Sequence, residues 1–408
     1  MQHTNIGVIG LAVMGANLAR NLADKKIRTV VYNRSAAKTK EFMEAYGACE
    51  FLEQAEDLAE LTAKLTRPRK IVLMIKAGEP VDAMLEALLP FLENGDIIID
   101  GGNSFFEDTV RRSKSLAAKG IEYVGMGVSG GEEGALHGPS LMPGCTLAAY
   151  KELEPMLKAI AAKAGAERSD ACVAHIGNGG AGHYVKMVHN GIEYADMQLI
   201  ADVYSVMHKV LRLSAEEMST VFAEWNTGEL SSYLVEITAD ILARKDSETG
   251  KPMVEMILDK AGQKGTGKWT GISALELGVP VPTISEAVFA RNLSSLKEER
   301  VLLAEKFSAL PSAGEELTPE RKTAYVEDLR RTLYAAKICA YAQGFNLLAA
   351  AGEHYDWQLN LGEIAKIWRN GCIIRAAFLD HVSESFAENK ELRNLLFSEY
   401  FAEALQTA

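Results

Sequence analysis

The sequence has little of what membrane, secreted or metal-binding proteins require. No apolar run approaches the roughly 18 residues that a transmembrane helix needs. The N-terminus, MQHTNIGVIG, has no signal-peptide pattern and leads directly into an expected strand. Because the cysteines show neither CxxC nor Cys/His metal spacing, we expect a cytoplasmic protein without a metal site. These cysteines are Cys49, Cys145, Cys172, Cys339 and Cys372.

An excess of basic residues is also missing. The formal net charge is −12, which argues against nucleic-acid binding. An anionic substrate would need a local cluster of cations, because the overall field of the protein does not attract it. At 408 residues, with 48% hydrophobic and 24% charged residues, the chain is expected to form two or three domains of ordinary globular composition.

The first third alternates short β-branched strands with helices. Expected strands lie in NIGVIG, RTVVYN and DIIID, and further strands are expected at residues 71–75 and 121–129. This alternation predicts a doubly wound, Rossmann-type α/β domain with a parallel sheet. Strand patterns stop near residue 179, so we place this domain at residues 1–178 and a large all-helical domain at residues 179–408.

The loop after the first expected strand matches a dinucleotide-binding fingerprint, with alanine in place of the central glycine. Its first glycine permits a tight turn, the alanine is small enough for a pyrophosphate to approach, and the last glycine allows helix and strand to pack closely. The pattern gains specificity from its place between a strand and a helix. The candidate pyrophosphate-binding residues are Gly10, Leu11, Ala12, Val13, Met14 and Gly15.

The end of the second expected strand indicates which dinucleotide binds. An NAD enzyme would carry a carboxylate there for the ribose, but this chain has Asn33, Arg34 and Ser35, with Lys38 one turn further on. A guanidinium, a hydroxyl and an ammonium are donors suited to a 2′-phosphate. The sequence therefore predicts NADP, although Arg34 as a solvated loop residue stays the alternative.

Two glycine-rich segments follow consecutive strands. They are IDGGNSFFEDT and the segment from GMGVSGG to PGC, and ligands of doubly wound folds bind at the carboxyl ends of strands. Asn103, Ser129, Gly130 and Gly131 offer amide, hydroxyl and backbone donors without bulk. Each glycine could instead serve only a tight turn, but two such loops together favour a ligand site.

Four polar residues share one face of the helix expected at residues 180–200: Lys186, His189, Asn190 and Glu193. Their i, i+3, i+4, i+7 spacing forms a stripe about 10 Å long. Val185, Val188 and Ile192 supply a separate, core-facing stripe. The polar stripe is either a solvated helix face or a substrate site.

An internal duplication helps to decide between these alternatives. Aligning Lys186 with Lys337 matches two helical segments, and WNTGELSSYLVEIT then matches WRNGCIIRAAFLDHV, which suggests copies at about 179–325 and 326–408. Opposite the other three members of the stripe, the second copy has Ala340, Tyr341 and Gly344. The fold does not need the polar stripe, so we interpret the first copy as keeping it for chemistry.

A third cluster, KGTGKWT, sets Lys264 and Thr266 among glycines. Backbone amides, a hydroxyl and an ammonium can cradle a phosphate, and Arg291 could add a cation. The segment is not a P-loop, and a flexible loop without a ligand stays the alternative.

Several motifs together identify a family resemblance. GLAVMG, NRS, IDGGNS, GVSGGEEGALHGPSLMPG, GAGHYVKMVHNGIEY and KGTGKWT occur in the order and spacing that resemble 6-phosphogluconate dehydrogenase (decarboxylating), over essentially the whole chain. The resemblance implies oxidation and decarboxylation of 6-phosphogluconate to ribulose 5-phosphate with NADP and without a metal. Separately, the duplicated helical segment contains more apolar surface than one short core requires, so we expect a homodimer through the helical domain.

The resemblance also implies roles for individual residues. Lys186 acts as general base and then as acid, and Glu193 protonates the product carbon. The implied substrate contacts are Asn103, Ser129, Gly130, Gly131, His189, Asn190, Tyr194, Lys264, Thr266 and Arg291. The implied cofactor contacts are residues 10–15, Asn33, Arg34, Ser35, Ile75, Lys76, Ala77 and Asn103.

One departure from the family and two alternatives stay open. Family members continue into a C-terminal tail that reaches the partner subunit, whereas this sequence stops at FAEALQTA, so the expected substrate affinity is reduced. Another 3-hydroxyacid dehydrogenase of the same superfamily would share the dinucleotide domain and the lysine. A catalytically impaired NADP-binding protein is the other alternative.

Overall fold

A computed structural model describes residues 5–165, 167–307 and 317–408. Its contacts define two compact units, and the boundary between them lies at Met187 and Val188, inside one long helix. After residue 354 the chain returns to the first unit for residues 355–373, and residues 374–408 belong to the second unit again. Residues 308–316, which belong to the first predicted repeat copy, lie outside the described residues, as do residues 1–4 and 166.

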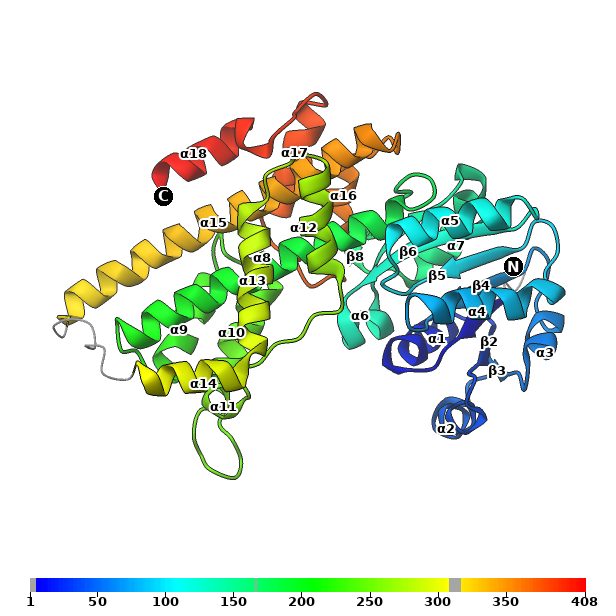
Figure 1. Ribbon diagram of the computed structural model, residues 1–408, viewed down its shortest axis with the longest axis horizontal. Helices are drawn as coiled ribbons and strands as arrows, with labels where there is room; N and C mark the ends of the chain where they lie inside the picture. Colours follow the sequence, from blue (N-terminus) through cyan, green and yellow to red (C-terminus); the bar gives the residue numbers. More distant parts are fainter. Residues whose placement is uncertain (1–4, 166, 308–316) are drawn as a thin grey trace. The chain divides into compact units, whose positions relative to one another are not determined.

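The first unit is built on a seven-stranded sheet with the order β3-β2-β1-β4-β5-β6-β7 (Figure 1). The strands are β1 (Ile6–Ile9), β2 (Thr29–Tyr32), β3 (Leu52–Gln54), β4 (Lys70–Leu73), β5 (Ile97–Asp100), β6 (Glu122–Ser129) and β7 (Ser140–Gly144). A separate two-stranded sheet pairs β8 (Lys163–Ala164) with β9 (Asp170–Ala171). The connecting helices are α1 (Val13–Asp24), α2 (Ala36–Tyr46), α3 (Leu58–Ala63), α4 (Glu79–Leu88), η1 (Leu89–Phe91), α5 (Phe106–Ala117), α6 (Gly131–His137) and α7 (Leu147–Ile160).

Both faces of the sheet are buried, which is why its strands are continuous runs of β-branched residues. On β5, Ile97 and Ile99 pack into a core formed with α1 and α7, whereas Ile98 between them packs into a second core formed with α3, α4 and α5. Successive side chains of a strand point to opposite faces, so one short strand serves two cores. This confirms the doubly wound α/β prediction.

The sheet is parallel, as predicted, except for one strand at its edge. β7 pairs antiparallel with β6, with Ser129 opposite Ser140 and Gly125 opposite Gly144. The connection contains only the seven-residue helix α6, which is too short for the crossover that a parallel neighbour requires. The segment SLMPG, interpreted from the sequence as part of a glycine-rich ligand loop, is this buried edge strand.

The second unit is built from helices, the first of which contains the boundary between the two units. They are α8 (Ala181–Lys209), α9 (Ala215–Trp225), α10 (Tyr233–Ala243), α11 (Met253–Met256), α12 (Thr266–Glu276), α13 (Pro282–Ser295), α14 (Lys297–Lys306), α15 (Pro319–His354), α17 (Leu379–Glu388), η2 (Leu395–Phe397) and α18 (Glu399–Thr407). Helix α16 (Leu361–Ile367) belongs to the returning segment of the first unit. No helix in the described parts of the chain has the length and apolarity needed to cross a membrane.

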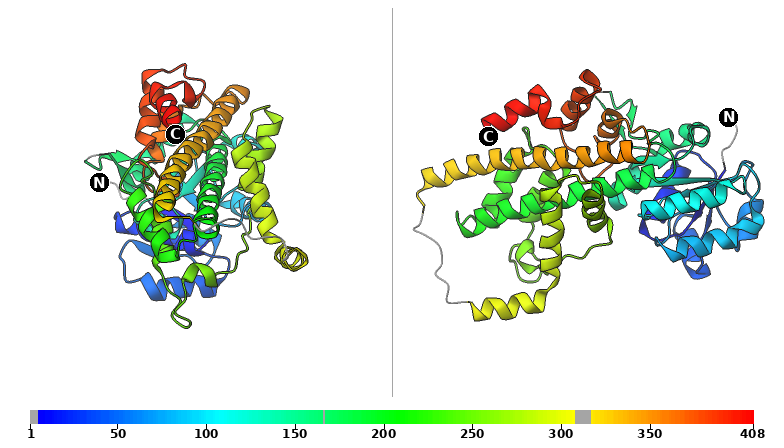
Figure 2. Two further views of the ribbon diagram at one scale, coloured as in Figure 1. Left: turned by 90° about the vertical axis from the view of Figure 1, so that its left-hand side faces the viewer. Right: turned by 45° about the horizontal axis from the view of Figure 1, so that its top comes forward.

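The two aligned long helices, α8 and α15, lie side by side (Figure 2). A Cβ atom at Gly344 would lie 2.4 Å from Ile192, so the helices pack at close distance where the second copy carries glycine. The segments that follow the aligned tryptophans also pair, since the Tyr233 amide donates to the Arg375 carbonyl and the Ala377 amide donates to the Ser231 carbonyl. The segments that the predicted duplication aligns therefore lie next to each other, and the duplication itself stays a prediction.

Lys337, the residue aligned with Lys186, forms a buried ion pair. Its ammonium lies 2.6 and 2.8 Å from the two carboxylate oxygens of Asp196, and both side chains are at most 1% exposed. A buried charge that loses its partner is costly, because neither water nor another group compensates it.

We expect Asp196→Asn to lower the free energy of unfolding by about 3–5 kcal/mol, because it leaves the Lys337 ammonium uncompensated. The double variant Asp196→Leu with Lys337→Met should recover most of this loss, since it removes both charges. Denaturant unfolding of both variants tests the pair. A single variant as stable as the unmodified protein would contradict it.

Candidate functional site

The turn after β1 leaves no space for side chains at its two glycines. Gly10 has a φ of +101°, and a Cβ atom there would lie 2.4 Å from the Met74 carbonyl oxygen. A Cβ atom at Gly15 would lie 1.9 Å from the Gly10 carbonyl oxygen. Helix α1 begins directly after Ala12, which provides no side-chain cap, so the N–H groups of its first turn point toward a ligand position. The fingerprint therefore has the geometry that pyrophosphate binding requires.

The strand order places this turn at the switch point of the sheet. β1 lies between β2 and β4, so the chain leaves β1 toward one side and returns at β4 on the other. Dinucleotides bind outside the carboxyl ends of strands at such a point. The loop after β4 carries the predicted contacts Ile75, Lys76 and Ala77, of which Lys76 is exposed.

The residues predicted to select NADP lie at the end of β2. The Asn33 side chain accepts a hydrogen bond from the Leu11 amide at 3.1 Å, which joins the end of β2 to the pyrophosphate turn. Arg34 and Ser35 follow it and are exposed, as is Lys38 in α2. These donors are accessible to a 2′-phosphate, and the described structure fits NADP at this position.

Glycines on β6 and β7 allow the backbone of α8 to pack directly against the backbone of the sheet. A Cβ atom at Gly182 in α8 would lie 2.2 Å from the carbonyl oxygens of both Gly125 and Met142. A Cβ atom at Gly127 would lie 2.5 Å from the Lys186 Cβ. Some of the glycines that the sequence suggested were ligand-binding therefore serve this packing. As a result, the stem of Lys186 lies directly against β6.

The loop that carries Asn103 is fixed by the carboxylate of Asp100. This carboxylate accepts hydrogen bonds from the Gly102 amide at 3.0 Å and from the Ser104 hydroxyl at 2.6 Å. Tyr123 also donates to it at 2.8 Å. Asn103 lies between two anchored residues and is exposed, so the loop presents its amide outward on a rigid base.

The second glycine-rich loop is held from two sides. Gly130 has a φ of +130°, and a Cβ atom there would lie 2.6 Å from the Gly371 carbonyl oxygen, in the returning segment. Ser129, at the end of β6, is 2% exposed, whereas Gly131 at the start of α6 is exposed. On the other side, the buried Asn21 of α1 donates to the Ala135 carbonyl of α6 at 3.2 Å.

The polar stripe of α8 is mostly buried. Lys186 is 6% exposed and His189 is fully buried, so a solvated helix face does not describe these two positions. Asn190 and Glu193 are half-buried, and the Glu193 carboxylate lies 3.8 Å from the His189 ring. The stripe therefore brings an amine, an imidazole, an amide and a carboxylate onto one helix face, with its two ends two turns apart.

Within the second unit, further predicted substrate residues contact Asn190 and Tyr194 of α8. The Asn190 amide donates to the Thr266 hydroxyl at 3.1 Å. Thr266 begins α12 and is 5% exposed. The Arg291 guanidinium lies 3.8 Å over the Tyr194 ring and donates to the Gly262 carbonyl. These contacts place Thr266 and Arg291 on the same side of α8, whereas Lys264 is exposed in the loop just before α12.

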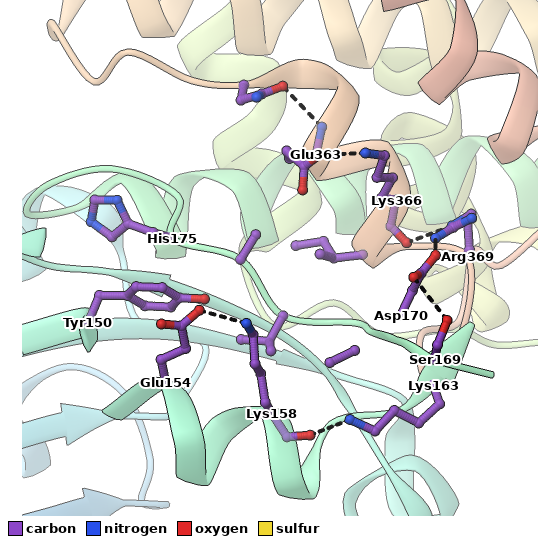
Figure 3. A pocket seen from close by; sticks show the side chains of 15 residues that line it. Tyr150, Glu154, Lys158, Lys163, Ser169, Asp170, His175, Glu363, Lys366 and Arg369 are labelled. Atoms are coloured by element: carbon purple, nitrogen blue, oxygen red, sulfur yellow. Dashed lines mark hydrogen bonds and ion pairs between the residues drawn. The ribbon is translucent and has the colours of Figure 1, made fainter. Parts of the chain in front are cut away.

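A cavity of about 610 Å³ in the first unit contains none of the predicted site residues (Figure 3). It lies by α7, the β8–β9 hairpin and α16, and its walls include three ion pairs. The pairs are Lys158 with Glu154, Lys366 with Glu363, and Arg369 with Asp170. Arg369 lowers the pKa of Asp170 by a side-chain hydrogen bond. The charges of these three pairs compensate one another, and the dinucleotide turn lies elsewhere in the unit.

Sequence reasoning missed His183, which lies one turn before Lys186. Its ring is fully buried between Thr109 and the backbone of Asp100. The i, i+3 spacing from Lys186 was available as a signal, but the sequence alone does not tell a core histidine from a positioning one. Asp100 was likewise not distinguished from the rest of the strand that it ends.

These features define the class of protein as a dinucleotide-dependent oxidoreductase. The class follows from a pyrophosphate turn at the switch point of the sheet, with a buried lysine on a helix packed against that sheet. The model of the NAD binding domain of 6-phosphogluconate dehydrogenase matches residues 5–177, and the model of the C-terminal domain of 6-phosphogluconate dehydrogenase matches residues 182–408. The chain belongs to the 6-phosphogluconate dehydrogenase family.

Individual relatives agree with this assignment. The NADP(+)-dependent, decarboxylating 6-phosphogluconate dehydrogenase of Bacillus subtilis (strain 168) is 55% identical over 410 residues, covering 100% of this chain and 85% of that protein. The structure of the Plasmodium falciparum enzyme, determined in apo form and with NADP+ or 6-phosphogluconate, has a TM-score of 0.93 and 44% identity, over 99% of this chain and 85% of that chain. A 3-hydroxyisobutyrate dehydrogenase of Mycobacterium tuberculosis covers 81% of this chain and 100% of its own, with a TM-score of 0.53 and 19% identity, so it shares the fold alone.

Proposed function

We propose that this chain oxidises and decarboxylates 6-phosphogluconate to ribulose 5-phosphate while reducing NADP to NADPH, and that the polar stripe of α8 carries out the proton transfers. The observation that carries the proposal is Lys186. Its side chain is buried and the stem of that side chain lies against Gly127 of β6, in a chain that belongs to the 6-phosphogluconate dehydrogenase family along its length.

NADP is held by the turn after β1 and by the ends of β2 and β4. The first-turn amides of α1 bind the pyrophosphate, and Arg34 and Ser35 bind the 2′-phosphate. Ile75, Lys76, Ala77 and Asn103 line the path toward the substrate. When bound, the nicotinamide supplies the acceptor for the hydride that leaves the substrate.

Lys186 acts first as a base and then as an acid. Its neutral amine takes the proton of the C3 hydroxyl as the hydride leaves C3, which gives a β-keto acid. Burial favours the neutral amine that this step needs. The resulting ammonium then donates its proton to the ketone oxygen, so the electron pair of the breaking C1–C2 bond forms an enediol as carbon dioxide departs.

Glu193 completes the reaction. The enediol needs a proton at the carbon that carried the carboxylate, and Glu193 lies two turns along α8 from Lys186, a rise of about 10 Å. A carboxylic acid there can deliver this proton while Lys186 takes back the proton of the enediol hydroxyl. His189, 3.8 Å from Glu193, orients the carboxyl group.

Each unit carries its own set of proposed substrate contacts. In the first unit they are Asn103 and the Ser129–Gly131 loop, and in the second unit they include Asn190. Lys264, Thr266 and Arg291 bind the phosphate, and Tyr194 holds Arg291 in place by stacking under its guanidinium.

We also propose a cytoplasmic homodimer. Each of the cysteines is a free thiol, which suits a reducing compartment. Helix α13 presents Phe289 and Leu293 four residues apart, and Leu296 follows directly after the helix; their exposed fractions are 66%, 59% and 50%. An exposed apolar stripe of this kind marks an interaction surface, and a second copy of the chain supplies an identical stripe.

We expect Phe289→Asp with Leu293→Asp to convert the dimer into a monomer, because burying two carboxylates in an apolar interface is unfavourable. Leu147→Asp is the matched control, since Leu147 is 54% exposed on α7 of the first unit. Light scattering should give twice the chain mass of 44.4 kDa for the unmodified protein and the control, and a single chain mass for the double variant. An unmodified protein at the single chain mass would contradict the dimer.

A substrate panel tests the proposed activity. Formation of NADPH is followed with 6-phosphogluconate and, separately, with 3-hydroxyisobutyrate. We expect reduction of NADP with 6-phosphogluconate and none with 3-hydroxyisobutyrate. Activity only with the shorter acid would favour another 3-hydroxyacid dehydrogenase, and NADP binding without turnover of either acid would indicate a catalytically impaired NADP-binding protein.

A further inference from the structure

A buried hydrogen-bond chain joins the start of α8 to the loop that carries Asn103. His183 Nε2 lies 3.0 Å from the Asp100 carbonyl oxygen, and its Nδ1 lies 2.7 Å from the Thr109 hydroxyl. The His183 side chain is 2% exposed and Thr109 is fully buried. One imidazole thus connects α8, the end of β5 and helix α5.

The protonation state of this imidazole follows from its surroundings. Burial lowers the pKa of His183, while the nearby Asp100 raises it and Arg112 lowers it. The ring is therefore neutral at neutral pH. A carbonyl oxygen only accepts hydrogen bonds, so Nε2 carries the hydrogen and donates it to Asp100, and Nδ1 accepts from the Thr109 hydroxyl.

The imidazole packs against the backbone of β6 at a glycine. A Cβ atom at Gly125 would lie 2.9 Å from His183 Nδ1 and 2.5 Å from the Thr109 methyl group. Glycine on β6 therefore admits the imidazole, just as Gly127, two residues on, admits the stem of Lys186. Because His183 and Lys186 are spaced i, i+3, both lie on the side of α8 that faces the sheet.

At its other end, this chain of hydrogen bonds fixes the loop that carries Asn103. The carbonyl of Asp100 receives the His183 hydrogen bond, and its carboxylate holds Gly102 and Ser104 on either side of Asn103. Asp100 itself is fully buried. A displacement of the imidazole would therefore change the position of Lys186 on α8 and the position of the loop at Asn103 together.

We propose that His183 is a positioning residue that sets Lys186 and Asn103 at a fixed distance from each other. The proposal rests on the proposed function, in which Lys186 takes the substrate proton and Asn103 contacts substrate and cofactor. His183 touches neither ligand in this account. Its neutral ring acts through the two hydrogen bonds.

His183→Leu removes both hydrogen bonds at similar volume. Misplacing a catalytic group by a fraction of an ångström is costly, so we expect kcat to fall on the order of 10- to 100-fold while the Kd for NADP changes by less than about threefold. His183→Gln places an amide N–H where Nε2 donates, and it should restore kcat to within about fivefold of the unmodified enzyme. Thr109→Val, which removes only the Nδ1 partner, should show a smaller loss in the same direction.

A matched control separates positioning from general stability. Asp96 directly precedes β5, at the opposite end of this strand from Asp100, and it is 1% exposed. It accepts hydrogen bonds from the Arg69 amide and guanidinium and from the Glu93 amide. Asp96→Asn should lower the melting temperature but leave kcat unchanged, because it lies far along the strand from the carboxyl ends.

The outcomes are distinct. With substrate deuterated at C3, the isotope effect on kcat should rise in His183→Leu, because the hydride step becomes slower than product release. Variants of His183 and Asp96 that lower the melting temperature alike and leave kcat alike would overturn the positioning role. An unmodified enzyme without activity toward 6-phosphogluconate would instead overturn the proposed function, which the substrate panel detects separately.

Discussion

Replacing Lys186 by methionine should lower kcat by roughly 10²–10⁴-fold, because one side chain supplies both the base and the acid of the reaction. NADP binding should stay nearly unchanged, since no part of the pyrophosphate turn depends on this amine. The melting temperature should also change little, because methionine fills the same space against Gly127. Steady-state kinetics, dinucleotide titration and thermal melting measure the three quantities.

Two further variants make the Lys186 experiment specific. Lys186→Arg keeps a cation of similar reach but cannot give up its proton, so it should be as inactive as the methionine variant. Lys186→Ala leaves room for a small primary amine, and added ethylamine should restore part of the rate. Normal turnover by the methionine variant would contradict the role of Lys186 as base.

Replacing Arg34 by aspartate should reverse the choice of dinucleotide. The unmodified enzyme should strongly prefer NADP, and the variant should lose a charge-assisted contact worth roughly 1.5–3 kcal/mol, which is about a 10- to 150-fold loss in kcat/KM for NADP. The new carboxylate can accept a hydrogen bond from the ribose of NAD, so use of NAD should rise. The ratio of kcat/KM for the two dinucleotides reports the change.

A charge-matched control accompanies the Arg34 variant. Lys25→Asp makes the same change in net charge at the exposed C-terminal end of α1, away from the end of β2. It should leave the ratio of NADP to NAD use as it is in the unmodified enzyme. Equal use of the two dinucleotides by the unmodified enzyme would refute the assignment of the 2′-phosphate to Arg34.

The fold could be predicted from the sequence where a pattern has one physical meaning. Short β-branched runs such as IIID, bounded by turns, are typical of buried strands, and the doubly wound sheet followed from them. The short strand β3 and the antiparallel strand β7 could not be predicted. Ser140–Gly144 contains a proline and a glycine, residues that are rare within strands, and its pairing is set by the short connection through α6.

The candidate site was only partly predictable, because single residues served two purposes. Gly125 and Gly127 admit a helix to the sheet, although the glycines of this segment resembled a ligand loop. His183 resembled a core histidine, and its hydrogen bonds to Thr109 and Asp100 appear only when residues far apart in sequence meet. The stripe from Lys186 to Glu193 was predictable because it depends on helical spacing within one element.

The central claim is that this chain couples hydride loss to decarboxylation of one substrate. It is tested most directly by measuring NADPH and carbon dioxide in the same reaction, with 6-phosphogluconate as the only carbon source. The account predicts equal amounts of the two products throughout the time course, with ribulose 5-phosphate as the remaining sugar. NADPH without carbon dioxide, or neither product, would contradict it.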